Sequence, residues 1–156
     1  MMDSVLKRKA FAYITSGRCV LLLAHPDHPD AGIQVPAGTV RAGEAVLDAA
    51  VREAREETGL TGLEVMGVLG EHTFDMRPFG RNEMHHRTFA HLVCREATPE
   101  SWEHWEGDPE GRPGEKIRFQ LYWVSLDEPL PELVAGHAAA IPALRRLLAG
   151  RSQARR

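Results

Sequence analysis

The sequence predicts an α/β fold, an α/β/α sandwich around a mixed β-sheet. Three observations lead to this prediction. Apolar residues recur with helical spacing between Ala45 and Thr58. A second helical pattern, which includes Ile141, Leu144 and Leu148, closes the chain. Apolar runs before and between these two segments have the alternation and the flanking turn residues of β-strands.

The first two strands are expected from about Lys9 to Thr15 and from about Cys19 to Ala24. Ser16-Gly17-Arg18 supplies a tight turn between them. The polar stretch 25–32 contains Pro26 and Pro29 and is expected to be a loop near the mouth of a site.

The helix from Ala45 to Thr58 has an apolar stripe that should face the core, and Gly59 suits a left-handed cap at its end. Glu53, Glu56 and Glu57 fall together on a neighbouring face, where three like charges repel one another. Such a face is often plain solvated surface. However, clustered carboxylate oxygens suit Mg²⁺ or Mn²⁺. The glycines of the preceding loop, Gly38 and Gly43, can bring backbone close to these acids.

The second half of the chain predicts more sheet and a closing helix. Strands are expected within 63–74, 84–95 and 116–125, and the helix is expected to stop at Gly150, before a basic tail at 151–156. The twenty residues 96–115 are expected to form a long loop, with its tryptophans anchoring it to the body. Arg77 and Arg81 are candidate phosphate binders, and His85 is a candidate substrate contact.

The bulk properties limit the class of protein. The chain has 156 residues, 43% of them hydrophobic, which predicts one domain over 1–150. A net charge of -3 argues against general attraction to nucleic acid. Cys19 and Cys94 lie in apolar runs and are expected to be reduced core residues. No run is long enough to span a membrane or to act as a secretory signal, so a cytoplasmic location is expected.

The segment from Gly38 to Leu60 matches the pattern G-x5-E-x7-R-E-U-x-E-E-x-G-U, in which U is aliphatic. The matching residues are Gly38, Glu44, Arg52, Glu53, Ala54, Glu56, Glu57, Gly59 and Leu60. This resembles the signature of the Nudix hydrolase family. Ala54 is smaller than the usual aliphatic residue, and Ala37 stands where similar proteins have glycine.

The resemblance implies the Nudix α/β/α fold and a set of roles. Glu53, Glu56 and Glu57, with the carbonyl of Gly38, would hold Mg²⁺, for which Mn²⁺ can substitute. Arg52 would orient the glutamates, and Glu44 would support them. The run 110–115 resembles a loop in which a glutamate assists catalysis, and Glu110 fits that role best, ahead of Glu115; Glu56 is its rival as the general base.

The expected activity is therefore Mg²⁺-dependent hydrolysis of a diphosphate bridge in a nucleoside di- or triphosphate or another nucleoside diphosphate derivative. Alternatives are a nucleotide sensor without activity, a hydrolase of ADP-ribose or of dinucleoside polyphosphates, and an isoprenoid diphosphate isomerase that uses a cysteine. The expected partner is a small nucleotide, with neither nucleic acid nor membrane. The sequence leaves the substrate, the number of metal ions and the choice between monomer and homodimer open.

Overall fold

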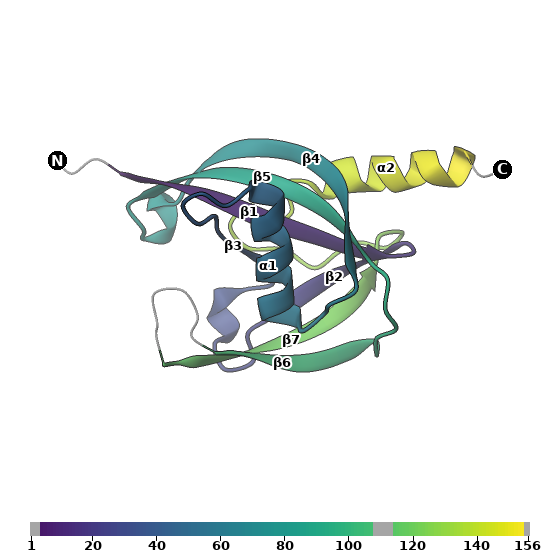
Figure 1. The fold of residues 1–156 in the computed structure, drawn as a ribbon, viewed down its shortest axis with the longest axis horizontal. Coiled ribbons are helices and arrows are strands. Elements are labelled where there is room, and N and C mark those ends of the chain that lie inside the picture. The colour runs from purple at the N-terminus through teal and green to yellow at the C-terminus, as the bar shows by residue number, and fades with distance from the viewer. Residues whose placement is uncertain (1–3, 108–113, 155–156) are drawn as a thin grey trace.

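The computed structural model describes residues 4–107 and 114–154, and side chains as far as residue 150. Its β-strands are β1 (Val5–Ser16), β2 (Cys19–Ala24), β3 (Ala37–Thr39), β4 (Leu63–Asp75), β5 (Glu83–Cys94), β6 (Ser101–Gly107) and β7 (Lys116–Ser125). Its helices are α1 (Val46–Thr58) and α2 (Ile141–Ala154), with short 3₁₀ helices η1 (Pro29–Ala31) and η2 (Arg77–Phe79) (Figure 1). None of the helices in the part of the chain described is long and apolar enough to cross a bilayer.

The strands form one mixed sheet in the order β4-β5-β1-β2-β7-β6, and β3 pairs with β1. β1 runs parallel to β5 over most of its length, whereas the other strand pairs are antiparallel. Along its other edge β1 changes partner. Its first half pairs with β3, at Lys9, Ala10 and Phe11, and its end pairs with β2, at Thr15 and Ser16. The sheet therefore forks beside β1.

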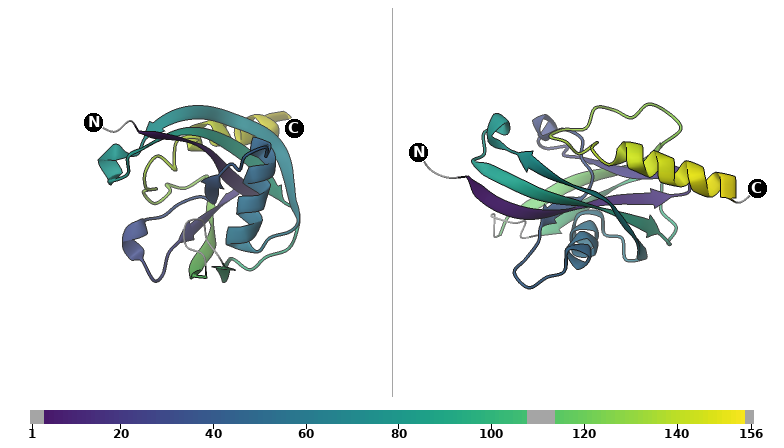
Figure 2. Two further views of the ribbon diagram at one scale, coloured as in Figure 1. Left: turned by 60° about the vertical axis from the view of Figure 1, so that its left-hand side comes forward. Right: turned by 90° about the horizontal axis from the view of Figure 1, so that it is seen from above.

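The two long helices cover opposite faces of the sheet (Figure 2). On the α1 side, alternate residues of β1 such as Ala10, Ala12 and Ile14 pack with Ala50 and Ala54 of the helix. On the α2 side, Phe11 and Tyr13 pack with Phe89 of β5 and with Leu144 of α2. This arrangement confirms the predicted α/β/α sandwich with a mixed sheet.

Most predicted elements are confirmed. β2 has the predicted bounds, β7 spans the predicted 116–125, and α1 starts one residue later than expected. Both faces of β5 are largely buried, which fits the apolar residues on both of its sides. Cys19 and Cys94 are free thiols, as expected.

The prediction of one long loop over 96–115 was wrong, because Ser101–Gly107 forms the edge strand β6. Its inward positions hold Trp102, His104 and Glu106, so polar residues hid the alternation. Trp102 does anchor this segment, since its indole N–H donates to the carbonyl of Thr58 at 2.9 Å. Trp105 is 54% exposed.

Three further elements differ from expectation. The short strand β3 was not predicted, and it leaves Ala37 unstrained because its φ is not positive. β4 is a single strand of 13 residues with irregular register near Gly67 and Gly70, where one or two short strands were expected. α2 continues through Gly150 to Ala154, so the predicted stop at Gly150, with a tail beginning at 151, was wrong. A helix tolerates a single glycine at a modest cost in free energy.

Candidate active site

Helix α1 positions most of the acidic side chains. It ends at Gly59, which has a left-handed φ of 78° and donates its N–H to the carbonyl of Arg55, as the predicted cap requires. Ala49, Ala50 and Ala54 are fully buried, and their small side chains let the helix lie close to the sheet. The neighbouring acidic face therefore lies against β3 and β6.

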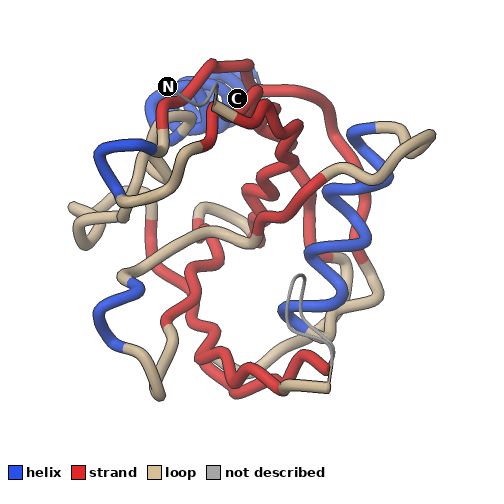
Figure 3. Tube along the Cα trace, turned by 90° about the vertical axis from the view of Figure 1, so that its left-hand side faces the viewer, coloured by secondary structure: helices blue, strands red, loops and turns tan. Residues whose placement is uncertain are grey.

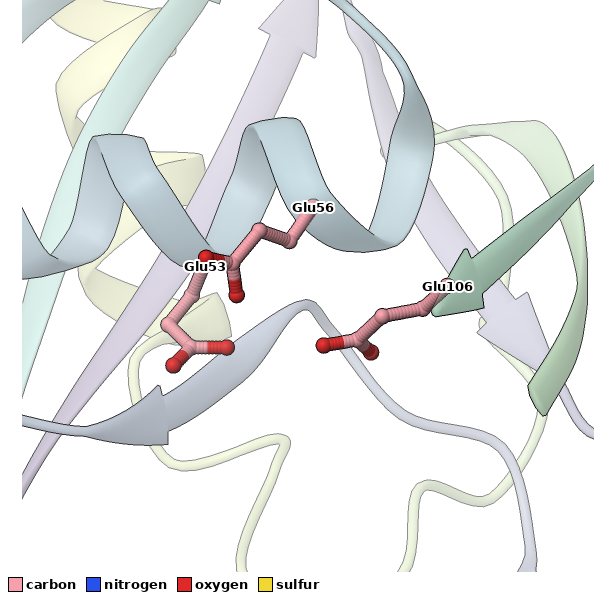
Figure 4. Close-up of side chains that lie close together, drawn as sticks. All are labelled: Glu53, Glu56 and Glu106. Atoms are coloured by element: carbon pink, nitrogen blue, oxygen red, sulfur yellow. The ribbon is translucent and has the colours of Figure 1, made fainter. Parts of the chain in front are cut away.

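Glu53, Glu56 and Glu106 each offer a carboxylate oxygen, and these oxygens lie within 4.8 Å of one another. Figure 4 shows that the first two side chains leave α1, that Glu106 leaves the end of β6, and that all three are directed into one space. Glu53 is 7% exposed, so its charge is largely removed from water. The sequence analysis did not identify Glu106; its period-two spacing from Trp102 was only a weak signal, because His104 and Glu106 are polar.

Gly38 of β3 lies directly against this group. A β-carbon at Gly38 would overlap the carboxylate of Glu53, so the close approach requires glycine there. The glycine thus brings the backbone of β3 next to an acidic side chain, as the sequence suggested.

Arg52 ties the acidic residues together. Its Nε and Nη2 donate to the two carboxylate oxygens of Glu44 at 2.8 and 3.0 Å. Its Nη1 donates to Glu53 at 2.7 Å and lies 3.5 Å from an oxygen of Glu56. These hydrogen bonds lower the pKa of Glu44 to about 2, so Glu44 stays ionised. The structure thus places Glu44 and Arg52 where they hold Glu53 in a fixed orientation.

Glu57 occupies a different position from its two helical neighbours. Its carboxylate accepts the backbone N–H of Ala37, with nitrogen–oxygen distances of 3.1 and 3.4 Å. Burial, followed by the nearby charge of Glu53, raises the pKa of Glu57 well above its ordinary value. The structure therefore groups Glu53 and Glu56 with Glu106, while Glu57 lies deeper, beside β3.

Three clefts open beside these acids. One of them, ≈ 420 Å³, is lined by Arg52, Glu53, Glu56 and Glu106. The other two open where the sheet forks. The small cleft, ≈ 320 Å³, is lined by Glu53, Glu57 and Glu106. The large cleft, ≈ 580 Å³, reaches Arg87 and His137. Both clefts are lined by Lys9, His25, Gln34, Ala37, Gly38 and Arg81. The clefts are therefore neighbours that share a wall, and together they have room for a nucleotide-sized ligand.

The loops around the clefts come from distant parts of the chain. Figure 3 shows η1 and η2 on the same side of the molecule, with α1 on the other. Asp30 and Ala31 of η1 and Phe79 of η2 line the large cleft. The loop 25–32 thus reaches the site, as the sequence predicted.

Of the remaining predicted site residues, some line the clefts and others do not. Arg81 lines both clefts. Arg77 instead pairs with Asp75 at 2.8 Å and is not among the described residues that line these clefts, so the structure does not place it as a substrate contact. His85 lines the large cleft, but both ring nitrogens have protein partners, Glu83 at 3.0 Å and Arg87 at 3.2 Å. Glu110 lies outside the described residues.

The cysteines lie away from the acidic group. The thiol of Cys94 donates to the carbonyl of Glu96 at 3.4 Å, and among the described lining residues of both clefts there is no cysteine. This placement gives no support to the alternative of a cysteine-dependent isomerase.

Comparison with known proteins gives one family and several similar structures. The family model of the NUDIX domain matches residues 5–144. No curated protein matches the chain. Among solved structures, a MutT NUDIX hydrolase from Burkholderia pseudomallei has 20% identity and a TM-score of 0.60, over 89% of this chain and 98% of that one.

Two other solved structures have a similar fold. An ADP-ribose pyrophosphatase from Streptococcus suis has 22% identity and a TM-score of 0.59, over 93% of this chain and 91% of that one. A UDP-X diphosphatase has 16% identity and a TM-score of 0.65, over 97% of this chain. This chain spans only 66% of that longer protein. Because the sequence identities are this low, the similarity to these three structures shows a shared fold and nothing further.

Proposed function

Because this chain belongs to the Nudix hydrolase family and is a hydrolase of diphosphate bonds, we propose that it is a metal-dependent pyrophosphohydrolase for a nucleoside di- or triphosphate or another nucleoside diphosphate derivative. The observation that carries this proposal is the convergence of Glu53, Glu56 and Glu106 within 4.8 Å. We propose Mg²⁺ as the natural ion, with Mn²⁺ as a substitute.

The donor set fits such an ion. Three carboxylates from two separate elements repel one another. Of the nearby cations, Arg52 is already shared among Glu44, Glu53 and Glu56, and the exposed Arg41 lies 3.9 Å from Glu56. Hard oxygen ligands are the type that Mg²⁺ and Mn²⁺ prefer. Bound in this position, such an ion would shield the diphosphate, polarise its phosphoryl oxygens and make water a better nucleophile.

The chain's own residues then have distinct roles. Glu53, Glu56 and Glu106 would hold the ion, and Glu57 and the carbonyl of Gly38 would be further ligands at the small cleft. Arg52 fixes the orientation of Glu53, and Glu44 fixes that of Arg52. Lys9 and Arg81 add positive charge to the wall shared by the two clefts, where anionic substrate oxygens would lie.

Glu56 is the described residue best suited to accept a proton from the attacking water. Its side chain is 36% exposed, compared with 10% for Glu53, so water reaches it. Glu110 is retained as an alternative on the sequence resemblance alone.

We also propose that the chain acts as one domain over 1–150 in the cytoplasm, where free thiols such as Cys19 and Cys94 stay reduced.

The test combines a substrate screen with a metal titration. Nucleoside di- and triphosphates, nucleoside diphosphate sugars, ADP-ribose and dinucleoside polyphosphates are incubated with the protein, with and without Mg²⁺. Products are identified by mass spectrometry. We expect turnover of at least one class only with metal, and Glu56→Gln should lower it at least about a hundredfold. Binding without turnover of any compound would favour the nucleotide sensor.

Metal binding is measured separately from activity. Electron paramagnetic resonance of Mn²⁺ titrated into the protein should show weaker binding for Glu106→Gln. The matched control is Glu103→Gln, which removes a charge from an outward position of the same strand. Equal Mn²⁺ affinity of both variants would exclude Glu106 from the metal centre.

A further inference from the structure

Arg87 and His137 form the inner wall of the large cleft, and the proposed hydrolysis does not use them. Arg87 is 2% exposed. Its guanidinium carbon lies over two aromatic rings, 3.8 Å from the centroid of Phe74 and 4.7 Å from that of Phe11. Packing against the two rings restricts the orientation of the guanidinium and leaves its N–H groups for hydrogen bonds.

The hydrogen-bond partners of Arg87 are all uncharged. Nη1 donates to the carbonyl of Ala135 at 2.6 Å, Nη2 to the sulfur of Met76 at 3.3 Å and Nε to Nδ1 of His85 at 3.2 Å. A guanidinium has five N–H groups, so two are left over. Within the described part of the chain, no carboxylate pairs with Arg87.

A buried cation without a counter-charge is costly. Burial lowers the pKa of Arg87 to about 10, which still leaves it protonated at neutral pH. The cation–π contacts and the carbonyl of Ala135 offset part of this cost. Ala135 itself has a φ of 48°, a strained value for alanine, so the loop is held in an unfavourable conformation over the cation.

His137 presents a second hydrogen-bond donor to the same cleft. Its Nδ1 accepts the backbone N–H of Val35 at 3.1 Å, so the neutral ring carries its proton on Nε2. Among the described residues, none accepts a hydrogen bond from this Nε2, although the residue is only 8% exposed. The hydroxyl of Tyr13 donates to the carbonyl of His137 at 2.7 Å and fixes its backbone.

The inner wall thus offers donors and positive charge. Asp30 is the single carboxylate among the described residues that line the large cleft, and Lys9 and Arg81 add cations. A ligand group at Arg87 must therefore accept hydrogen bonds and carry negative charge.

This group differs from the diphosphate that is cleaved. Arg87 of β5 pairs with Lys9 of β1, so their side chains lie on the same face of the sheet. Ala10, the next residue of β1, has its side chain on the opposite face, which packs against α1. Ala10 in turn pairs with Gly38, on which Glu53 packs. Arg87 is therefore on the α2 side of the sheet and the glutamates on the α1 side.

We propose that Arg87 and His137 bind an anionic group, a phosphate or a carboxylate, on the part of the substrate that extends away from the scissile diphosphate. This specificity role rests on the proposed function, because it assumes that the diphosphate lies at the glutamates. Arg87 would use its two remaining N–H groups on the anion, and His137 would add one donor from Nε2.

The first experiment measures anion binding without catalysis. Inorganic phosphate is titrated by calorimetry into metal-free protein in EDTA, where the acidic cluster repels anions. Wild type and Arg95→Gln should bind it, and Arg87→Gln should bind it at least about tenfold more weakly, the loss of one charge-assisted hydrogen bond. Arg95 directly follows β5 and has an exposed partner, Glu64, so it is a matched control for charge. Equal binding by all three proteins would overturn the proposal.

The second experiment uses substrate pairs that differ by one remote anionic group, UDP-glucuronate against UDP-glucose and NADP against NAD. In a pair that wild type hydrolyses, the more anionic member should have a KM lower by about tenfold, and Arg87→Gln should remove the difference. An unchanged KM ratio in Arg87→Gln would overturn the proposal. If no compound of the wider substrate screen is hydrolysed either, the proposed function fails while the phosphate titration still reports on Arg87.

A third measurement needs no variant, because a substitution at a buried arginine can impair folding. Crystals of metal-free wild type are soaked in phosphate. We expect density within hydrogen-bond reach of Arg87 and of Nε2 of His137. A well-ordered cleft without an ion there would refute the assignment.

Discussion

Gly38 and Glu53 lie so close that a β-carbon on the glycine would occupy the space of the glutamate carboxylate. The φ of Gly38 is not in the left-handed region, so space rather than backbone strain requires the glycine. The Glu53 carboxylate can thus occupy its place beside β3 only when residue 38 lacks a side chain.

Gly38→Ala should therefore produce a folded protein with little activity. The Glu53 carboxylate is the mobile end of a side chain and can move away, but it then loses its 2.7 Å contact with Arg52. We expect kcat/KM to fall roughly a hundredfold, as for a misplaced catalytic group, with a small drop in Tm. Gly70→Ala, where a β-carbon meets nothing within 4 Å, is the control. Wild-type activity of Gly38→Ala would show that the position of Glu53 is unimportant.

Arg52→Lys tests the hydrogen-bond geometry at constant charge. The guanidinium reaches both oxygens of Glu44 and also Glu53, whereas an ammonium group donates from a single nitrogen. We expect Mn²⁺ affinity and kcat to fall by about tenfold, the equivalent of one charge-assisted hydrogen bond. Arg55→Lys, on the exposed side of the same helix, should leave both unchanged. If both variants behave alike, charge alone accounts for the role of Arg52.

Glu57→Gln should change the pH dependence of stability. Because the folded-state pKa of Glu57 is raised, its contribution to stability is lost as pH rises through that pKa. In metal-free protein the glutamine variant should therefore melt above wild type at pH 8, and the difference should shrink toward pH 5. Calorimetry at several pH values tests this; a difference independent of pH would contradict the raised pKa.

If Glu57 is a metal ligand, bound metal should make wild type melt at a higher temperature than Glu57→Gln. Saturating Mg²⁺ is expected to raise the Tm of wild type more than that of Glu57→Gln, and turnover of the variant should fall at least about a hundredfold. Equal metal-induced shifts of Tm in wild type and Glu57→Gln would show that Glu57 is not a metal ligand.

His137 should stay neutral in mildly acidic solution. Burial, followed by the charge of Arg87, lowers the pKa of His137 to about 3. The N–H of Val35 on Nδ1 fixes the tautomer. Long-range ¹H–¹⁵N spectra at pH 5 should show a neutral ring with its proton on Nε2. A protonated ring at that pH would show that the inner wall is more hydrated than its packing indicates.

Patterns of spacing predicted the fold and the helical part of the site. The apolar stripe and Gly59 located α1 because helical periodicity and a left-handed cap are local features of sequence. The periodicity of the same helix also predicted that Glu53 and Glu56 lie on one face. Glu106 could not be found in that way, because it belongs to the acidic group only once β6 has folded beside α1.

Arg87 was missed for a different reason. In the sequence it is one of the alternating residues of a strand, with nothing to separate it from a surface arginine. Its burial arises from Phe11 on β1, Phe74 on β4 and Ala135 after β7, which meet only in the folded protein. Contacts between segments so distant leave no local pattern.

The change of partner along β1 has one more consequence. The clefts open where two strands diverge, and several residues that line them, among them His28, Asp30 and Arg81, belong to neither hydrophobic cluster. These side chains can thus be exchanged while both hydrophobic clusters stay filled. New substrate preferences could arise in this scaffold, in nature or by engineering, with little loss of thermal robustness.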